Sequence, residues 1–596
     1  MNGCISKRRI RGVNVSAFED ELSVPDPLFT NGPKERSMRT IRQAASAGFA
    51  AALLATLPSL AAAQSPICAQ LGTDPSFGLV GHPHLSSVSS EVIPAAGNNA
   101  AYCHLDLMVA SESGPEAGYL PGQSEQIRVR VGLPLSAADG GAGGVQGAWN
   151  GKQRDLGGGG CAGAAGAPTA ATNGAYVGTS TDTGHAGGGC TFALNPDGTL
   201  NWGKIKDFAR DGIHAQRVWG EAAAELYYGM APTRHYWTGG STGGRQGHQH
   251  AQAFPKDYDG ILAGCPAFNW DRFIPSELWP QVVMQAELGG PIAGAKLTAV
   301  SNAAIQACDM LDGIQDGIVQ EPRRCNYDAR SFICTGGAGD PANCLTAAEA
   351  AAVNKIWNGP VNAKGEKIWF GLERGAPLGS LAGTNPFAIA REHFQYWIHQ
   401  DPDFDWRTVT EASFVDDFAT SQELFNEVIG TDQASLHAFR QGGGKMIMYY
   451  GLYDPLIFPR GAYDYYNRAA EKMRAASAKK GEKPSAAAGM AALQEFYRFF
   501  PYPNGGHCGG GSGPQINTNV LFDALVNWVE NGVAPDHFVA SQNLGGGATR
   551  TRKICKYPEV LTYNGSGSTD DQENFHCAAR AVDFPELLEA DRLGKP

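Results

Sequence analysis

The chain contains 596 residues with a net charge of −12 at pH 7, and 43% of its residues are hydrophobic. This length can bury a large core and still carry an added domain. The acidic balance and the lack of a long basic run argue against nucleic acid as a partner.

The first 63 residues are predicted to be a leader. The stretch 38–63 has a basic start, an Ala/Leu-rich apolar run and an Ala-Ala-Ala end, which is typical of a secretory signal peptide. A membrane anchor would normally need a longer apolar run. Residues 1–37 are mixed in charge and interrupted by prolines, so we expect translation to start at Met38. The mature protein is then secreted or periplasmic, without a stable membrane anchor.

The cysteine content agrees with export. The chain has thirteen cysteines, and cleavage near Ala63 would remove Cys4 and leave an even number. In an exported protein this favours disulfide bonds. No C-x-x-C pair occurs, so a zinc site is not expected.

Strands and helices are predicted to alternate as far as about residue 267. A glycine-rich stretch fills residues 140–166, and a long helix is expected over 204–228. The strands expected in this part are residues 126–131, 175–179 and 259–264, together with a short run from His235 that leads to Ser241. The alternation predicts an α/β fold with a mostly parallel sheet covered on both faces.

The alternation stops at about residue 267, and a helix-rich insertion begins at residue 270. Strand patterning resumes at 445–450, and 496–500 is the last expected strand, with a loose surface loop over 475–490. We therefore expect a core domain made of residues 64–269 and 441–596. The inserted lid domain is expected over residues 270–440.

Ser241 is the candidate nucleophile. It lies in Gly239-Gly240-Ser241-Thr242-Gly243, between a predicted strand and a predicted helix. Such a glycine-flanked serine is typical of a nucleophile elbow, where a strained turn exposes the hydroxyl and neighbouring side chains would clash. In so glycine-rich a chain the pattern could also be a flexible turn, so its partners decide the interpretation.

An acid and a base are predicted downstream, in the order that elbow hydrolases use. Asp454 follows the 445–450 strand, and His507 lies in a glycine-rich loop after the 496–500 strand. Asp454 could also simply initiate an Asp-Pro turn. His185, which follows a strand, is the rival base, whereas His248 and His250 are expected to be surface or packing residues.

Main-chain amides are expected to bind the oxyanion. One donor should be the amide of Thr242, directly after the nucleophile. The second is expected in the glycine run 157–160, where we assign Gly158. The same run could alternatively be a flexible linker.

Two longer segments carry a family resemblance. Residues 239–247 and 254–261, in which Phe-Pro-Lys-Asp-Tyr-Asp-Gly-Ile follows the elbow helix, resemble the tannase and feruloyl esterase family. That family also contains the esterase acting on mono(2-hydroxyethyl) terephthalate. Supporting matches are residues 149–151, 181–185, 401–406 and 505–508. The resemblance covers about residues 68–577 and implies an α/β-hydrolase core with a large lid, and the triad Ser241, Asp454 and His507.

The resemblance also implies a structural calcium site in the lid. Its ligands would be the side chains of Asp309, Asp312 and Asp316 and the carbonyls of Ile314 and Ile318. Three carboxylates separated by glycine turns repel one another unless a hard cation lies among them. The same segment could instead be an acidic surface turn.

The cysteines depart from the family pattern at one position. The resemblance implies the disulfides Cys68–Cys103, Cys308–Cys325, Cys334–Cys344 and Cys555–Cys577. Family members typically also join a cysteine just before the nucleophile to the one just after the histidine. Here Gly240 occupies the first position while Cys508 keeps the second. We therefore hypothesise a relocated Cys265–Cys508 bond, with Cys161–Cys190 closing the glycine loop.

The predicted function is hydrolysis of aromatic esters of the feruloyl or galloyl type through an acyl-enzyme, with no redox cofactor. Lid aromatics are expected to form the lid core or stack on the substrate ring; they are Trp270, Phe273, Trp279, Phe370, Trp397, Trp406 and Phe414. Between Trp406 and Phe418, Arg407 is the one candidate to anchor a free carboxylate, which makes a terephthalate-ester specialist the weaker candidate. The sequence is also compatible with a non-catalytic, calcium-stabilised binding protein and with a serine peptidase.

Overall fold

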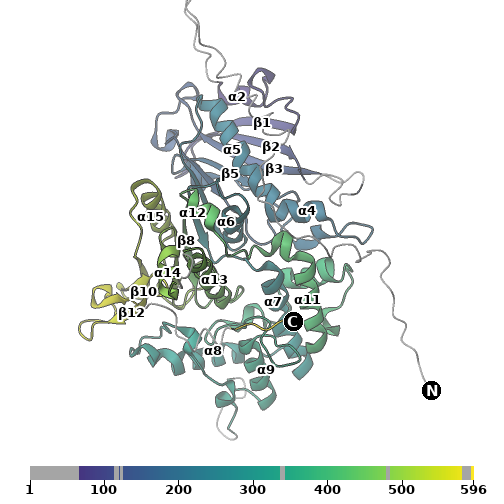
Figure 1. Cartoon of the computed structure of the whole chain (residues 1–596), viewed down its shortest axis with the longest axis vertical. Coiled ribbons are helices and arrows are strands. Elements are labelled where there is room, and N and C mark those ends of the chain that lie inside the picture. The colour runs from purple at the N-terminus through teal and green to yellow at the C-terminus, as the bar shows by residue number, and fades with distance from the viewer. Residues whose placement is uncertain (1–65, 113–119, 121–124, 336–342, 478–483, 580–591) are drawn as a thin grey trace, which may run out of the picture. The chain divides into compact units, whose positions relative to one another are not determined.

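The computed structural model describes residues 66–112, 120, 125–335, 343–477, 484–579 and 592–596 (Figure 1). The predicted leader, the signal peptide over 38–63 and the Met38 start lie outside the described residues. No helix within the described ranges combines the length and the apolar character needed to cross a bilayer.

A nine-stranded sheet forms the centre of the fold and confirms the α/β prediction. Its strand order is β1-β2-β3-β5-β4-β6-β7-β8-β9. The strands are β1 (Leu85–Ile93), β2 (Tyr102–Ala110), β3 (Gln126–Pro134), β4 (Gln153–Leu156), β5 (Val177–Thr181), β6 (His235–Gly240), β7 (Gly260–Gly264), β8 (Lys445–Gly451) and β9 (Tyr497–Tyr502). From β5 to β9 the neighbours run parallel, whereas β1, β2, β3 and β5 pair antiparallel.

Helices cover both faces of the parallel part of the sheet (Figure 1). Successive residues of a strand point to opposite faces, and in β6 Tyr236 packs with helix α15 (Thr518–Asn531) while Trp237 faces the cluster on the other side. Helix α6 (Thr242–Ala253) follows β6 directly and packs against β6 and β7. Strand β7 is buried throughout, which agrees with its uninterrupted Gly-Ile-Leu-Ala-Gly sequence.

Several elements differ from the sequence predictions. Strand β4 lies inside the glycine-rich stretch, where no strand was expected. The helix predicted over 204–228 consists of α4 (Trp202–Lys206) and α5 (Gly212–Tyr228), separated by a π-helical turn. The predicted loop 475–490 contains the start of α14 (Ala486–Gln494), which Ser485 caps by accepting from the Ala488 amide. Its alanines favour a helix.

Strand β9 is not the last strand, contrary to the prediction. Two small antiparallel pairs follow it, each forming a two-stranded sheet. They are β10 (His537–Gly545) with β11 (Ala548–Cys555), and β12 (Val560–Tyr563) with β13 (Phe575–Ala578).

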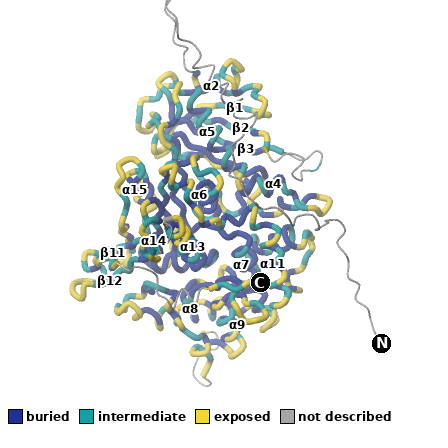
Figure 2. Tube along the Cα trace, viewed as in Figure 1, coloured by how far each residue is buried: buried dark blue, intermediate teal, exposed yellow. Residues whose placement is uncertain are grey.

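The segment between β7 and β8 is helical and begins with a long, central helix. α7 (Trp270–Leu288) packs against most of the others, which are α8 (Gly294–Cys308), α9 (Ala347–Asn358), α10 (Ala388–Glu392), α11 (Glu411–Phe425) and α12 (His437–Gln441). One buried cluster runs from Trp237 in the sheet through Trp270 to Phe414 in α11 (Figure 2). This cluster contains residues of both predicted domains, so it marks no boundary between them. The division into a core of residues 64–269 with 441–596 and a lid of 270–440 therefore stays a prediction.

Candidate active site

Ser241 occupies a sharp turn between β6 and α6. Its backbone has φ 58° and ψ −125°, a sparsely populated conformation that costs about 1–3 kcal/mol and persists only where the surroundings enforce it. Its amide donates to the Gly264 carbonyl (2.9 Å), and its carbonyl accepts from Ala267 (3.0 Å). A Cβ on Gly239 would lie 2.6 Å from the Gly243 backbone. The glycine at 239 is therefore required by the close approach of strand and helix.

His507 and Asp454 form a hydrogen-bonded pair. Asp454 follows β8 and is fully buried, and its Oδ2 lies 2.8 Å from Nδ1 of His507, in the loop after β9. Because an ionised carboxylate only accepts, Nδ1 carries the proton and Nε2 is left with its lone pair. The other oxygen, Oδ1, accepts from the amides of Leu456 (2.9 Å) and Ile457 (3.0 Å). These amides fix the carboxylate in the orientation that meets the histidine.

The surroundings of His507 favour the protonated, charged form of its imidazole. Burial of the imidazole, the largest single effect, lowers the pKa of His507, but the hydrogen bond and the negative charge of Asp454 outweigh it. The net pKa of His507 is raised above its usual value. Asp454 therefore stabilises the imidazolium that would form if His507 took a proton from a nucleophile.

A cavity of about 180 Å³ brings Ser241 and His507 to one space. Thr242 and Gly160 line it beside them, and the remaining wall residues are Ala267, Trp270, Phe273, Ile274, Glu277, Phe387, Ile389, Leu456 and Ile457. Its wall is mostly apolar, with hydroxyl, imidazole and carboxyl groups at a few points. This combination is typical of a small-molecule site.

The oxyanion assignment to Gly158 needs correction. The Gly158 amide donates to Oε1 of Gln246 (3.0 Å), a side chain of α6, so it is already engaged. The cavity is lined by Gly160, whose carbonyl accepts from the Thr242 hydroxyl (2.5 Å). Thr242 itself lies in the first turn of α6 and lines the cavity, as the assignment of its amide requires. The glycine run thus approaches the nucleophile, but through Gly160 rather than Gly158.

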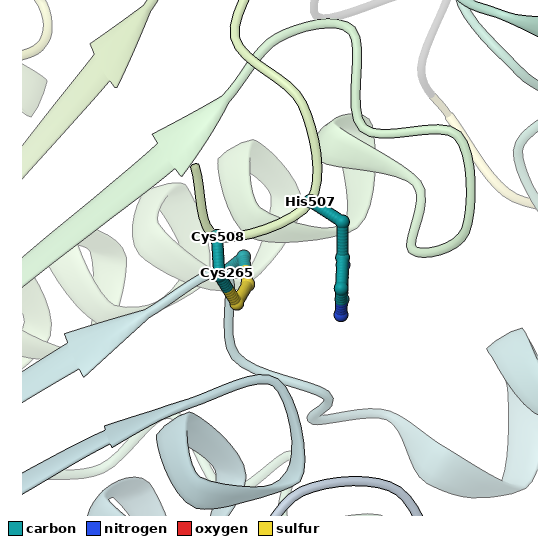
Figure 3. A group of neighbouring side chains, drawn as sticks. All are labelled: Cys265, His507 and Cys508. Carbon is teal, nitrogen blue, oxygen red and sulfur yellow. A yellow bond between two sulfur atoms is a disulfide. The ribbon is translucent and has the colours of Figure 1, made fainter. Parts of the chain in front are cut away.

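Six disulfides occur in the described residues, and they are the six pairs expected from the sequence. They are Cys68–Cys103, Cys161–Cys190, Cys265–Cys508, Cys308–Cys325, Cys334–Cys344 and Cys555–Cys577. Cys265 and Cys508 have Cα atoms 5.2 Å apart, and Figure 3 shows their sulfurs beside the His507 side chain. The bond joins the residue after β7 to the residue after His507. It therefore ties the histidine loop to the strand next to the elbow strand.

Two clusters in the described residues contain side chains of the kinds that bind metals. Within the described ranges, Cys265, His507 and Cys508 are the one group whose side chains converge as metal ligands could, but both sulfurs are consumed by the disulfide. The acidic turn at 309–318 is arranged around backbone amides. Oδ1 of Asp309 accepts from Gly317 (2.9 Å), and Oδ1 of Asp312 accepts from Ile314 (3.0 Å).

The other three histidines considered from the sequence are buried packing residues. Both ring nitrogens of His185 face backbone carbonyls, with Nε2 2.7 Å from Cys161 O, and burial lowers its pKa to about 4. It does not line the cavity, so it is not the base. His248 meets the Tyr497 hydroxyl (2.8 Å) and His250 meets Asp257 (3.0 Å), and both are buried. They are packing residues, not surface residues.

Two of the lid aromatics singled out in the sequence, Trp270 and Phe273, line the cavity. The others lie elsewhere in the lid core: Trp279 packs on Phe414, for example, with ring centres 5.1 Å apart. Arg407 is 60% exposed and pairs with Asp405, so it is not a wall residue. An anchor for a free carboxylate at this position is not found.

Sequence reasoning missed several wall residues. Phe387 and Ile389 come from the start of α10, and Leu456 and Ile457 come from the turn after Asp454. Glu277 lies on α7, one helical turn after Phe273 and two turns after Trp270. Its sequence signal was a carboxylate in the apolar stripe of a lid helix.

Comparisons with known proteins identify the family of this chain. The family model described as "Tannase and feruloyl esterase" matches residues 145–578. A probable feruloyl esterase of Arthroderma benhamiae is 33% identical over 479 residues, covering 77% of this chain and 83% of that protein. An uncharacterized esterase of Xanthomonas campestris pv. campestris is 32% identical over 454 residues, 69% of this chain and 75% of that protein.

Solved structures show the same architecture. Feruloyl esterase B from Aspergillus oryzae superimposes with a TM-score of 0.71 at 26% identity, covering 86% of this chain and 99% of that chain. The tannin acyl hydrolase from Aspergillus niger, at 21% identity and a TM-score of 0.72, covers 89% and 98% and supports the fold alone. This chain therefore belongs to the tannase and feruloyl esterase family and is a carboxylic ester hydrolase of the α/β-hydrolase fold.

Proposed function

We propose that this protein is a secreted serine esterase that cleaves aromatic esters of the feruloyl or galloyl type. The observation that carries the proposal is the convergence of Ser241 and His507 on one cavity, with His507 held by buried Asp454. A serine needs such a base to take its proton, and the base needs an acid to orient it.

The reaction follows from this arrangement. Ser241 Oγ attacks the ester carbonyl while Nε2 of His507 takes the hydroxyl proton. The oxyanion is met by the amide of Thr242 and by an amide of the glycine run near Gly160. Collapse breaks the ester C–O bond, and His507 returns its proton to the leaving alcohol. Water then attacks the acyl-enzyme with His507 as base and releases the acid, which restores Ser241.

The aromatic preference is supported by the cavity wall. Trp270, Phe273 and Phe387 supply ring surfaces, and aliphatic side chains complete the enclosure. Rings pack favourably on one another in stacked or edge-to-face arrangements. The cavity is smaller than the roughly 300–1,000 Å³ of pockets that enclose a drug-sized ligand. It can therefore hold one ring-bearing group while the rest of the ester extends outward.

Calcium is proposed as a structural ion at the acidic turn. Partial burial, and then the charges of Asp316 and Asp309, raise the pKa of Asp312 to about 6, so the carboxylates oppose one another. Asp309, Asp312 and Asp316 would bind calcium through carboxylates, with the carbonyls of Ile314 and Ile318. Arg552 pairs with Asp316 and already supplies one positive charge. Carboxylate and carbonyl oxygens are the ligands that a hard cation prefers.

Secretion is supported by the disulfides and by the leader sequence. All twelve cysteines in the described residues are paired, as expected for an oxidising compartment. N-terminal sequencing of exported protein should find a start near residue 64. A mature chain beginning well upstream of Ala61 would contradict the signal-peptide assignment.

A panel of three esters tests the substrate class. We expect hydrolysis of methyl ferulate or methyl gallate at rates well above those of mono(2-hydroxyethyl) terephthalate, since Arg407 does not reach the cavity wall. Ser241→Ala is the control that removes the nucleophile. Preference for the terephthalate ester would overturn the proposed substrate class, and activity unchanged in Ser241→Ala would overturn the mechanism.

A further inference from the structure

A carboxyl group interrupts the apolar face that helix α7 turns towards the cavity. Trp270, Phe273, Ile274 and Glu277 are spaced three and four residues apart, so they share one face of the helix, and all four line the cavity with Ser241. Glu277 is 1% exposed. Apart from His507, it is the one ionisable side chain in the described wall of this cavity.

Glu277 has an unsatisfied oxygen. Its Oε2 is buried and finds no hydrogen-bond partner among the described residues. Leaving such a group unpaired costs about 1–3 kcal/mol, whereas a leucine at this position would pack against its apolar neighbours without that cost. A carboxyl group kept at this point is explained if it meets a polar group of the substrate.

The protonation of Glu277 makes it suited to a neutral partner. Burial, and secondly the nearby charge of Asp454, raise the pKa of Glu277 well above its usual value. The neutral acid is thereby favoured, and it offers an O–H donor as well as a carbonyl acceptor. A phenolic hydroxyl is both donor and acceptor and matches this group.

We propose that Glu277 is a specificity-determining residue that hydrogen-bonds a hydroxyl group on the aromatic ring of the ester. The proposal rests on the proposed function, because the ring must enter the cavity that Ser241 and His507 line. A site built to pair with a substrate hydroxyl discriminates strongly against the analogue that lacks it, since its own polar group is then left unpaired.

A purely positioning role for Glu277, exerted through Asp454, would have different kinetic effects. Burial, and after it the charges of Asp454 and Glu277, raise the pKa of Tyr450, so the three groups are neighbours. The Tyr450 hydroxyl is also unpartnered among the described residues. If Glu277 acted through Asp454 alone, its replacement would change the hydrolysis of all esters equally. It would also shift the pH profile that His507 sets.

Substrate pairs that differ by one hydroxyl separate these roles. We would measure kcat/KM for methyl p-coumarate and methyl cinnamate with the wild type, Glu277→Gln and Glu277→Leu. Glu287→Gln, on the same helix but paired with Lys355 at the surface, is the matched control. We expect the preference for the hydroxylated ester to fall about tenfold or more in Glu277→Leu. Glu277→Gln should retain part of it, and Glu287→Gln should retain all of it.

The outcomes are distinguishable. A preference unchanged in both folded Glu277 variants, or an equal loss on both esters, overturns the role of Glu277 and leaves the esterase intact. Wild-type protein that hydrolyses neither of these two esters overturns this inference, and wild-type protein that also leaves methyl ferulate and methyl gallate intact overturns the proposed function as well. Because Glu277→Gln preserves shape, it remains informative even if Glu277→Leu fails to fold.

Discussion

A Cβ atom on Gly240 would lie 2.9 Å from Sγ of Cys508. The disulfide between Cys265 and Cys508 therefore occupies the space beside the elbow that a side chain at position 240 would need. The resemblance places a cysteine at 240 in family members, bonded to the residue after the histidine. Here Cys265 takes that role from the neighbouring strand, and glycine at 240 makes room for it.

Removal of this bond should impair catalysis as well as stability. The bond closes a loop of 243 residues and holds the His507 loop against β7. In Cys265→Ser/Cys508→Ser we expect a lower Tm, corresponding to roughly 2–4 kcal/mol, and a fall in kcat as the position of His507 relaxes. Differential scanning calorimetry and ester kinetics would measure both.

The control for this prediction is Cys68→Ser/Cys103→Ser. That bond ties the short N-terminal helix to β2, away from the triad, so its loss should lower Tm with kcat retained. Equal effects of the two double variants on kcat would contradict a catalytic role for the Cys265–Cys508 bond.

The pH dependence should report the His507–Asp454 pair. His507 must be neutral to act as a base, and its pKa is raised in the folded protein. We therefore expect kcat/KM to rise with pH, with a midpoint above about 6.5, the value for a free imidazole. A midpoint below that value in the free enzyme would contradict the assigned pairing.

The same shift has a consequence for stability. Because the folded pKa lies above the unfolded one, the stabilisation of protonated His507 is fully present below about pH 6.5 and is lost as pH rises through the folded pKa.

Asp454→Asn should lower the pH midpoint of the rise in kcat/KM and reduce kcat by several orders of magnitude.

Calcium removal should loosen the turn that supports the histidine loop. Asn504, three residues before His507, is fully buried, accepts from Val319 (3.1 Å) and donates to the Gly317 carbonyl (2.7 Å). We expect a chelator to lower Tm in the wild type, and Asp312→Asn to reduce that shift. An unchanged Tm with chelator, together with no calcium by elemental analysis, would refute the site.

Gln246 should position the glycine run. Its Oε1 accepts from Gly158, two residues before Gly160 in the cavity wall. Gln246→Met keeps the side-chain length but removes the acceptor, and we expect kcat to fall about tenfold or more with a smaller change in KM. Gln249→Met, on the same helix but bonded to Thr431, is the control for damage to the helix. An equal loss of kcat in both would contradict the assignment.

The sequence predicted the elements that local sterics and periodicity dictate. The elbow could be predicted because the backbones of Gly239 and Gly243 come so close that a side chain at position 239 would clash, which requires glycine there. Strand β8 could be predicted from its long apolar run. Asp454 and His507 were found because each lies in the loop that follows a strand of the parallel sheet. A residue can be placed near a strand end even when the predicted bounds of the strand are wrong by a few residues.

What depended on tertiary contacts was not predictable. Strand β4 was missed because it has only four residues, two of which, Gln153 and Asp155, are buried and polar. Asp155 accepts hydrogen bonds from the side chains of Gln153 and Thr179. Gly158 was misassigned because its amide is used by a side chain from a helix about ninety residues later. No local sequence pattern predicts a hydrogen bond between two residues so far apart in the chain.

Covalent labelling of Ser241 tests the central claim most directly. The folded protein would be treated with a fluorophosphonate and measured by intact mass and peptide mapping, with Ser241→Ala alongside. We predict one phosphonyl group per chain, on the peptide that contains Ser241, and none on the variant. Folded wild-type protein that stays unlabelled, or a variant that is labelled to the same extent, would contradict the claim that Ser241 is the nucleophile.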